Sequence, residues 1–531
     1  MSRFKHGIVV AAHPLAARAG VSILKKGGNA VDAAAATALA LGAVTPAFCG
    51  IGGGGFGLIW LASEERAIFV DFRERAPLAS KDDMFRVSRT DKVFRNENSI
   101  GHRSVAVPGS VAGHSLMIQK YGRLRLRDAL GPATQYARKG FEVSRTMAYV
   151  WRRSVSKLRP FRGSRTIYLK RGGPYREGDK IRLRDLANSF RAIARHGPDE
   201  FYNGRISKTI YEDMTSNDGL LSPTDLERYT PTIRDPMRGT YRDYEVISAP
   251  PPSSGGAIIL QTLNMLEGHS LKRFRHNSPQ ALHLISEALM RSCNSIRPRI
   301  CDPDFSQIPM SELVSKDLAR KAAASVMPDS ASSSIESSDT RSADASNTSH
   351  LTVIDAQGNV VALTESVECY FGSGVVVPGT GILLNDTMHD FEASPGRLNS
   401  VGPWKVPMSS MCPTLVMKDG RPFMAVGSAG ATRIVSSVLQ TILNILEFNM
   451  SAENAVGAPR IHIQDDLIQV EKGIQSESVE KLREMGHLVG SKQPSSARLY
   501  FGGVHVALVR SENSELEGGA DPRRDGTALG Y

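Results

Sequence analysis

Short apolar runs alternate along the chain with longer amphipathic or Ala-rich segments, which is typical of a protein that mixes strands and helices. Pro14 suits the first turn of a helix that ends at a glycine pair, and Asn29 suits the N-cap of the Ala-rich helix after it. In the first hundred or so residues the pattern predicts strands over 7–12, 58–62, 67–73 and 105–109, and helices over 14–26 and 30–41.

The pattern changes twice further along the chain. Residues 110–325 are mostly helical in periodicity, with a hairpin near 241–248 and a helix over 257–266. From residue 348 onward, short Val/Ile/Leu runs alternate with glycine turns, and there is no internal repeat. This last part predicts strands over 351–354, 360–364, 381–384, 414–417, 423–426, 467–470 and 504–509, and helices over 432–448 and 451–458.

A glycine-rich run over residues 50–57 matches the dinucleotide-binding pattern GxGxxG at Gly50, Gly52 and Gly55. A dinucleotide loop follows a strand and opens a helix, whereas this run follows a helix and leads into a strand. We therefore interpret the glycines as positions of tight backbone packing near an active site.

The composition fits a globular protein with a substantial core, because 41% of the 531 residues are hydrophobic and 22% are charged. The formal net charge of +11 raises the possibility of nucleic-acid binding. The charge is uneven, since residues 1–347 carry 51 basic and 34 acidic side chains and residues 348–531 carry 14 and 20. We interpret this as complementarity between two halves of one body. The most basic stretch, 151–184, contains no nucleic-acid motif, so no nucleic-acid partner is expected.

Five cysteines are present, in an odd number and without CxxC or Cys/His metal spacing. No disulfide framework, metal or organic cofactor is expected, although Cys293 and Cys301 could pair. No run is long and apolar enough for a membrane span, and the first residues lack the apolar core of a secretory signal. The expected location is the cytoplasm as the sequence is written, or the periplasm or exterior if the true start lies upstream.

Thr348 stands at the head of a strand-like segment and directly after a Ser-rich polar stretch, residues 327–347. A hydroxyl residue in this place suggests a proenzyme that cleaves itself between Asn347 and Thr348. Thr348 would then carry both a nucleophilic hydroxyl and a basic α-amino group, as in N-terminal-nucleophile amidohydrolases. The alternative is an ordinary threonine on a half-buried strand.

The chain resembles the γ-glutamyltransferase (glutathione hydrolase) proenzymes nearly from end to end. Each matching block is short, and the resemblance rests on their number and order. The blocks are residues 12–16, 27–33, 50–56, 71–74, 107–113, 251–256, 348–350, 371–374, 381–385, 409–411, 427–430, 521–523 and 530–531.

This resemblance implies a single four-layer αββα sandwich (α/β class) of the N-terminal-nucleophile hydrolase type. One precursor would become a large fragment, residues 1–347, and a small fragment, residues 348–531, that remain associated as a heterodimer. The implied activity is cleavage of γ-glutamyl amides such as glutathione through a γ-glutamyl-Thr ester, with transfer to water or to an amino acid or peptide.

The resemblance also assigns the catalytic groups. Thr348 is the implied nucleophile, and Ser366 matches a hydroxyl position, usually Thr in the family, that hydrogen-bonds the nucleophile. Two backbone N–H groups stabilise the tetrahedral intermediate, and their positions match Gly430 and Ala431. The family has a second glycine where this chain has Ala431, which requires backbone dihedrals that alanine can adopt.

The glutamyl head group is a zwitterion, so its pocket must pair both charges. Arg73, Ser409 and Ser410 match the ligands of the α-carboxylate. Asp390 matches the acidic ligand of the α-amino group. Two nearby positions depart from the family, because Thr387 replaces Gln or Glu and Glu368 replaces Asn. We infer that Glu368 and Asp390 together hold the ammonium group.

Two alternatives remain open at this point. The departures at Thr387 and Glu368, together with a short connection over residues 392–406 that predicts an open cleft, fit an acylase with another preference, such as cephalosporin, glutaryl or poly-γ-glutamyl amides. An open cleft also favours hydrolysis over transfer. The second alternative is an unprocessed, inactive relative.

Overall fold

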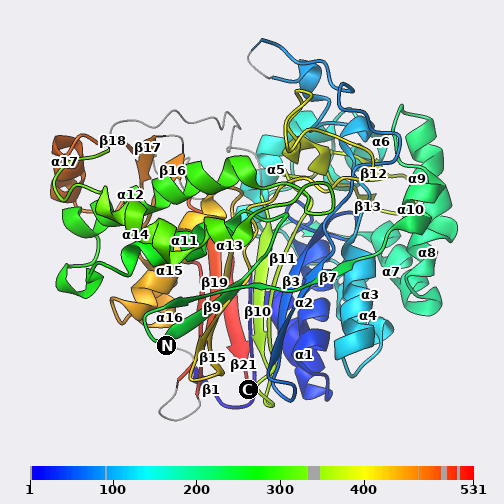
Figure 1. The fold of residues 1–531 in the computed structure, drawn as a ribbon. Helices are drawn as coiled ribbons and strands as arrows, with labels where there is room; N and C mark the ends of the chain where they lie inside the picture. Colours follow the sequence, from blue (N-terminus) through cyan, green and yellow to red (C-terminus); the bar gives the residue numbers. More distant parts are fainter. Residues whose placement is uncertain (1–2, 90–91, 333–346, 465, 492–498, 511–514) are drawn as a thin grey trace.

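Two stacked sheets of seven strands each form the centre of the protein, and helices cover the outer face of each sheet (Figure 1). The computed structural model describes residues 3–89, 92–332, 347–464, 466–491, 499–510 and 515–531. Neighbouring strands in both sheets are antiparallel. The four layers place the interface between the sheets at the middle of the molecule.

The first sheet contains the segment that starts at Thr348. Its order is β21 (Thr527–Gly530), β2 (Ile8–Ala11), β10 (Ser349–Ile354), β11 (Val360–Ser366), β3 (Gly54–Leu61), β4 (Arg66–Asp71) and β7 (Thr232–Arg234). The second sheet has the order β1 (Arg3–Phe4), β20 (Leu516–Ala520), β19 (Gly503–Val509), β15 (Arg421–Ala429), β14 (Thr414–Lys418), β9 (Tyr244–Ser248) and β8 (Met237–Tyr241).

Strands of the first sheet are apolar on both faces because each face meets a core. Successive side chains of a strand point to opposite faces. In β2, Val9 and Ala11 therefore join the core under the first helical layer, while Ile8 and Val10 join the core shared with the second sheet. This double burial explains why the sequence shows continuous apolar runs here rather than alternation.

Four helices, α1 (Pro14–Lys25), α2 (Ala30–Val44), α3 (Ser110–Tyr121) and α4 (Leu126–Lys139), lie over the first sheet, and α2 is buried along its whole length. Asn29 caps α2 in a reciprocal capping box with Asp32, as its place before the Ala-rich run predicts. The second sheet is covered by α11 (Gly255–Leu266), α12 (Pro279–Ile296) and α15 (Arg433–Leu446).

The remaining elements extend the two ends of the sandwich. Beyond the first helical layer lie α5 (Arg145–Leu158), α6 (Arg162–Tyr168), α7 (Arg184–His196), α8 (Asp199–Tyr202), α9 (Arg205–Thr215), α10 (Pro223–Arg228), and the short strands β5 (Phe141–Glu142), β6 (Lys180–Ile181), β12 (Val376–Val377) and β13 (Ile382–Leu383). Near α12 lie α13 (Met310–Leu313), α14 (Lys316–Ala324), α16 (Ala452–Gly457), α17 (Ser476–Glu484), and a small sheet of β16 (Ile461–Gln464), β17 (Leu467–Val470) and β18 (Leu488–Ser491).

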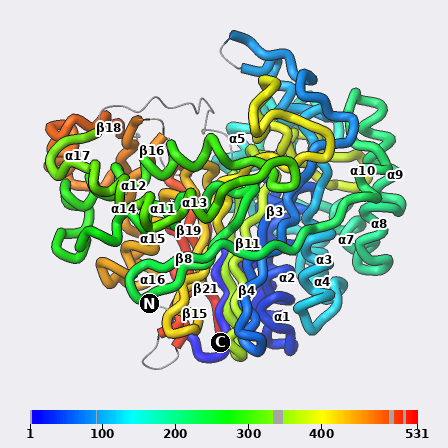
Figure 2. The backbone as a smooth tube through the Cα atoms, in the orientation of Figure 1, coloured from blue at the N-terminus to red at the C-terminus, as the bar shows by residue number. Residues whose placement is uncertain are grey.

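Residues from both sides of position 348 are interleaved in the first sheet. The strands β10 and β11, yellow-green in Figure 2, pair with the blue strands β2 and β3 on either side. Several ion pairs join a basic residue of the earlier part to an acidic residue of the later part, as in Lys157–Asp386 and Arg242–Glu447. These pairs agree with the interpretation of complementary charge between the two halves.

Most predicted elements are confirmed, and the exceptions have local reasons. The predicted strand over 105–109 is wrong, because this segment is irregular and only Val107 forms an isolated bridge, to Arg75. The glycine run does not merely precede a strand, since β3 already begins at Gly54. A Cβ atom on Gly53 would lie 2.0 Å from the carbonyl oxygen of Ser366, so the prediction of tight backbone packing is confirmed.

All five cysteines are buried and none forms a disulfide, so the possible Cys293–Cys301 pair is not formed. Within the described ranges, no helix combines the length and the apolar character that crossing a bilayer requires.

Candidate functional site

Thr348 lies at the start of β10, in the middle of the first sheet, and only 3% of its surface is exposed. The peptide bond to Asn347, which is 2% exposed, is continuous in the structure, so the fold is that of the uncleaved chain. β10 pairs with β11 from Ser349 onward and with β2 from Leu351 onward, so Thr348 directly precedes the first paired residue of the strand.

Ser366, the last residue of β11, is hydrogen-bonded to the peptide unit that would be cut. Its hydroxyl donates to the carbonyl oxygen of Asn347 at 2.6 Å and accepts from the backbone N–H of Glu368 at 2.8 Å. The N–H of Asn347 in turn donates to the carbonyl of Glu368 at 2.6 Å. In this uncleaved state Ser366 therefore polarises the carbonyl of Asn347, which the hydroxyl of Thr348 would attack. The resemblance instead pairs Ser366 with Thr348, one residue later.

Arg524 is a site residue that the sequence analysis missed. Its guanidinium donates to the carbonyl of Thr348 at 3.1 Å and to the side-chain oxygen of Asn347 at 2.5 Å. It is 4% exposed, and burial lowers its pKa. Gly503 makes room for it, since a Cβ there would lie 2.4 Å from the Arg524 side chain. The only sequence signal was its place directly after the block 521–523.

Gly430 and Ala431 connect the end of β15 to the start of α15, so their N–H groups lie near the positive end of a helix. Ala431 has a φ of 52°, in the left-handed region that costs alanine about 1 kcal/mol or more. Ala431 therefore adopts backbone dihedrals that favour glycine, at a cost in conformational energy. The hydroxyl of Ser410 donates to its carbonyl at 2.9 Å.

Arg73 is buried, with 2% of its surface exposed. Its guanidinium donates to the carbonyls of Pro407 and Met408, at 3.1 and 3.3 Å, and forms an ion pair with Asp390. Ser409 follows these two carbonyls, and its hydroxyl accepts from the N–H of Met411 at 3.1 Å. The structure thus brings the two predicted carboxylate-binding regions together.

Three carboxylates surround the single positive charge of Arg73. Burial acts to lower the pKa of Arg73, but the charges of Asp390, Glu74 and Glu368 raise it, and the net shift is upward. Burial raises the pKa of Glu74 to about 7, although Arg73 opposes this shift. Arg73 is therefore permanently charged, and the pocket as a whole is rich in negative charge.

The residues predicted to hold the α-amino group gather around a 3₁₀ turn, η5 (Thr387–Asp390). Oxygen atoms of Glu368 and Asp390 and a ring nitrogen of His389 lie within 4.8 Å of one another. Thr387 is fully buried beside Glu74, whose pKa its hydroxyl helps to lower. Glu368 and Asp390 are thus neighbours, and Thr387 faces inward, away from a role as direct ligand.

The protein has the N-terminal-nucleophile hydrolase fold, because two antiparallel sheets are stacked between helical layers and the Thr348 segment forms a central strand. The crystal structure of a cephalosporin acylase from Bacillus halodurans matches it with a TM-score of 0.90 at 26% identity, over 100% of this chain and 96% of that one. The predicted four-layer α/β architecture is confirmed.

A family model described as gamma-glutamyltranspeptidase matches residues 16–531. The chain is 37% identical to the glutathione hydrolase proenzyme of Escherichia coli, over 100% of this chain and 92% of that protein. A chain of the Helicobacter pylori gamma-glutamyltranspeptidase crystal structure is 34% identical, with a TM-score of 0.61, over 62% of this chain and 95% of that one. The chain belongs to the γ-glutamyltranspeptidase family, and its identification as an enzyme of this family is confirmed.

Proposed function

We propose that the protein cleaves itself between Asn347 and Thr348 and then breaks γ-glutamyl amide bonds, such as that of glutathione, through an ester on Thr348. The observation that carries this proposal is the Asn347 carbonyl, which is buried and hydrogen-bonded by Ser366 next to the Thr348 hydroxyl residue. Relatives of the chain are named proenzymes. The matched Helicobacter pylori chain spans 62% of this one, a share near that of residues 1–347.

Self-cleavage proceeds as an acyl shift in this arrangement. The Thr348 hydroxyl oxygen attacks the carbonyl carbon of Asn347, and the hydroxyl of Ser366 stabilises the charge that develops on the carbonyl oxygen. The C–N bond breaks, the nitrogen takes up the proton, and an ester links Asn347 to the Thr348 side chain. Water then hydrolyses the ester, which leaves a carboxylate on Asn347 and a free α-amino group on Thr348.

The mature site repeats the same chemistry on the substrate. The α-amino group of Thr348, with an ordinary pKa of about 8, accepts the hydroxyl proton as the oxygen attacks the γ-carbonyl. The N–H groups of Gly430 and Ala431 stabilise the oxyanion. The proton passes to the leaving amine, and water or an amino acid then takes the γ-glutamyl group from Thr348.

The zwitterionic head group of the substrate replaces the ion pair between Arg73 and Asp390 with two ion pairs between the pocket and the substrate. Arg73 and Asp390 pair with each other in the substrate-free structure. An α-carboxylate bound by Arg73, Ser409 and Ser410 and an ammonium bound by Asp390 and Glu368 leave no charge of the head group unpaired. Both new ion pairs are charge-assisted, which favours a substrate that carries both groups.

The charge of the pocket also favours a γ-glutamyl group over the acyl groups of the acylase alternative. A glutaryl group supplies a carboxylate but no ammonium, so it adds negative charge to a pocket in which carboxylates already outnumber the cation. A γ-glutamyl group brings an ammonium that offsets this excess. The cephalosporin acylase match keeps this alternative as the second candidate.

Two measurements test the proposal together. Mass spectrometry and N-terminal sequencing of the purified protein should find a chain that begins Thr-Ser-His-Leu, and a single intact chain with no turnover would favour the inactive relative. A γ-glutamyl anilide should be hydrolysed much faster than a glutaryl anilide. In Glu368→Gln this preference should shrink at least about tenfold, as loss of a charged hydrogen bond implies, while the exposed-residue control Glu227→Gln should keep it. A faster glutaryl reaction in the wild type would support the acylase.

A further inference from the structure

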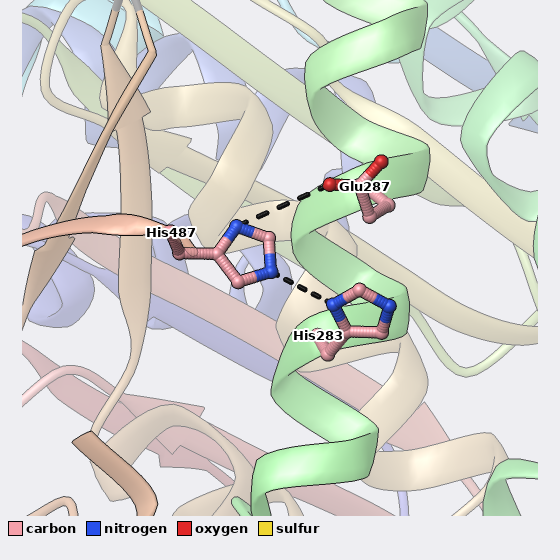
Figure 3. A group of neighbouring side chains, drawn as sticks. All are labelled: His283, Glu287 and His487. Carbon is pink, nitrogen blue, oxygen red and sulfur yellow. Dashed lines mark hydrogen bonds and ion pairs between the residues drawn. The ribbon is translucent and has the colours of Figure 1, made fainter. Parts of the chain in front are cut away.

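Three ionisable side chains meet in the interior far along the chain from Thr348 (Figure 3). His283 and Glu287 lie one turn apart on α12, and His487 lies between α17 and β18. Their exposed fractions are 1%, 1% and 6%, and one potential metal-ligating atom of each lies within 4.8 Å of the other two. None of them takes part in the mechanism above.

The hydrogen bonds of the cluster fix where the protons of the two rings lie. The Nε2 of His283 is 2.8 Å from the carbonyl oxygen of Met327, which can only accept, so this nitrogen carries a proton. In a neutral His283 the Nδ1 is then an acceptor, and it receives the Nε2–H of His487 at 2.7 Å. The Nδ1 of a neutral His487 is consequently a lone pair.

That lone pair faces a carboxylate. The Nδ1 of His487 lies 4.0 Å from Oε1 of Glu287, with no hydrogen available between them when both rings are neutral. Two acceptors that face each other in the interior leave a place for a cation.

The other oxygen of Glu287 is already held in place. Its Oε2 accepts from the hydroxyl of Ser332 and lies 3.5 Å from the guanidinium of Arg291, and the N–H of Ser332 donates to Oε1 at 3.1 Å. The atoms of metal-binding carboxylates and imidazoles that do not touch the metal commonly make hydrogen bonds that orient the ligand. The Nε2–H of His283 makes such a bond to Met327. The cluster therefore has both potential ligands and the groups that orient them.

We propose that His283, Glu287 and His487 bind a divalent transition metal such as Zn²⁺, with water as the fourth ligand. Two imidazoles and one carboxylate are a ligand set that Zn²⁺ takes, with bonds of about 2.0–2.2 Å and hence about 3.3–3.5 Å between ligand atoms. The two contacts involve different nitrogens of His487, with Nε2 at 2.7 Å from His283 and Nδ1 at 4.0 Å from Glu287. Metal binding therefore requires the ring of His487 to give up its hydrogen bond to His283 and to turn until one nitrogen faces both partners.

The site would join the two parts of the chain across the proposed cut. His283 and Glu287 precede residue 348 and His487 follows it, while the N–H of Ala331 donates to the carbonyl of Met485 at 2.6 Å beside the cluster. A bound metal would therefore tie α12 of the large fragment to the small fragment. Metal binding itself does not depend on the cleavage, so its failure would leave the proposed function untouched.

Metal content tests the site directly. Chelator-treated, untagged protein is loaded with Zn²⁺, passed through gel filtration, and assayed for metal by mass spectrometry and for its melting temperature. The wild type and the exposed-residue control His196→Gln should retain about one Zn²⁺ per chain and melt at a higher temperature with Zn²⁺ than without, because the metal binds the folded state. The variants Glu287→Gln and His487→Gln should bind Zn²⁺ more than about tenfold more weakly.

A second measurement needs no variant and so does not depend on their folding. Cu²⁺ bound to the wild type should show an electron paramagnetic resonance spectrum with splitting from two imidazole nitrogens. Retention of no metal by the wild type, equal Zn²⁺ affinity in the two cluster variants, or a Cu²⁺ spectrum without nitrogen splitting would each overturn the proposal.

Discussion

The proposed cleavage junction and the proposed acyl pocket are organised by different interactions. The junction at Asn347 and Thr348 lies directly before a paired strand and is held by short hydrogen bonds, two of them from the Arg524 guanidinium. The pocket around Arg73 is organised by ion pairs in which carboxylates outnumber the cation. Geometry is therefore decisive at the junction, where substitutions should act on the rate of cleavage, and charge balance is decisive in the pocket, where substitutions should act mainly on substrate affinity.

Removal of the proposed nucleophile should abolish cleavage of the chain. Thr348→Ala should remain a single chain and lose at least about a thousandfold in turnover, since both cleavage and acyl transfer use the same hydroxyl. Thr348→Ser keeps the hydroxyl and should be cleaved and active, though more slowly. Gel electrophoresis and a γ-glutamyl anilide assay measure both effects. A fully active, uncleaved Thr348→Ala would contradict the mechanism.

The pocket should respond in affinity before rate. Arg73→Lys keeps the charge opposite Asp390 but loses the planar, two-point contact with a carboxylate, and kcat/KM should fall about a hundredfold, mainly through KM. Cleavage of the chain should remain unaffected, because Arg73 belongs to the pocket and makes its bonds there. The exposed control Arg195→Lys should change neither quantity. Loss of cleavage in Arg73→Lys would mean that the two regions are not separable.

Ser366→Ala should slow self-cleavage without changing substrate binding in the pocket. The lost hydrogen bond to the Asn347 carbonyl stabilises developing charge and is worth about 1.5–3 kcal/mol, so the rate of self-cleavage should fall about ten- to a hundredfold. Ser366→Thr, the family's usual residue, should restore it. The rate is measured from the intact fraction over time after purification. Normal cleavage by Ser366→Ala would remove the proposed role.

The smallest effect concerns the pH dependence of stability in the pocket. The folded-state pKa of Glu74 is raised to about 7 by burial, so the folded protein holds a proton that the unfolded chain releases at lower pH. Its contribution is fully present below about pH 4.5 and is lost as pH rises through about 7, by at most about 3 kcal/mol. The melting temperature of Glu74→Gln should therefore fall less between pH 5 and pH 8 than that of the wild type.

Glu227→Gln is the matched control for Glu74→Gln and should follow the wild-type curve, because Glu227 is exposed. Identical slopes for the wild type and Glu74→Gln would show that Glu74 is ionised at neutral pH. The pocket would then carry more negative charge than proposed.

Short sequence patterns predicted those features that depend on interactions between neighbouring residues. The cap at Asn29, the helix after it and the hairpin near residue 241 depend on a few neighbouring residues, and the structure confirms them. The segment 105–109 resembled a strand because of its valines, but its partners offer only one bridge. Arg524 carried no pattern of its own, since its partners lie 176 and 177 positions away in the chain. Glu74 lies within a matching block, but its raised pKa follows from its burial in the folded protein.

The sequence by itself determined most of the strands and helices and the family, and it predicts Thr348 as the nucleophile, because periodicity, caps and short motifs depend on residues that are close together in the chain. Only the tertiary structure decided that Arg73 pairs with Asp390, that Arg524 holds the Asn347–Thr348 peptide, and that His487 meets His283 and Glu287. Charges and hydrogen-bonding groups act through space over a few ångströms, so their partners are set by how the sheets and helices pack and not by their order along the chain.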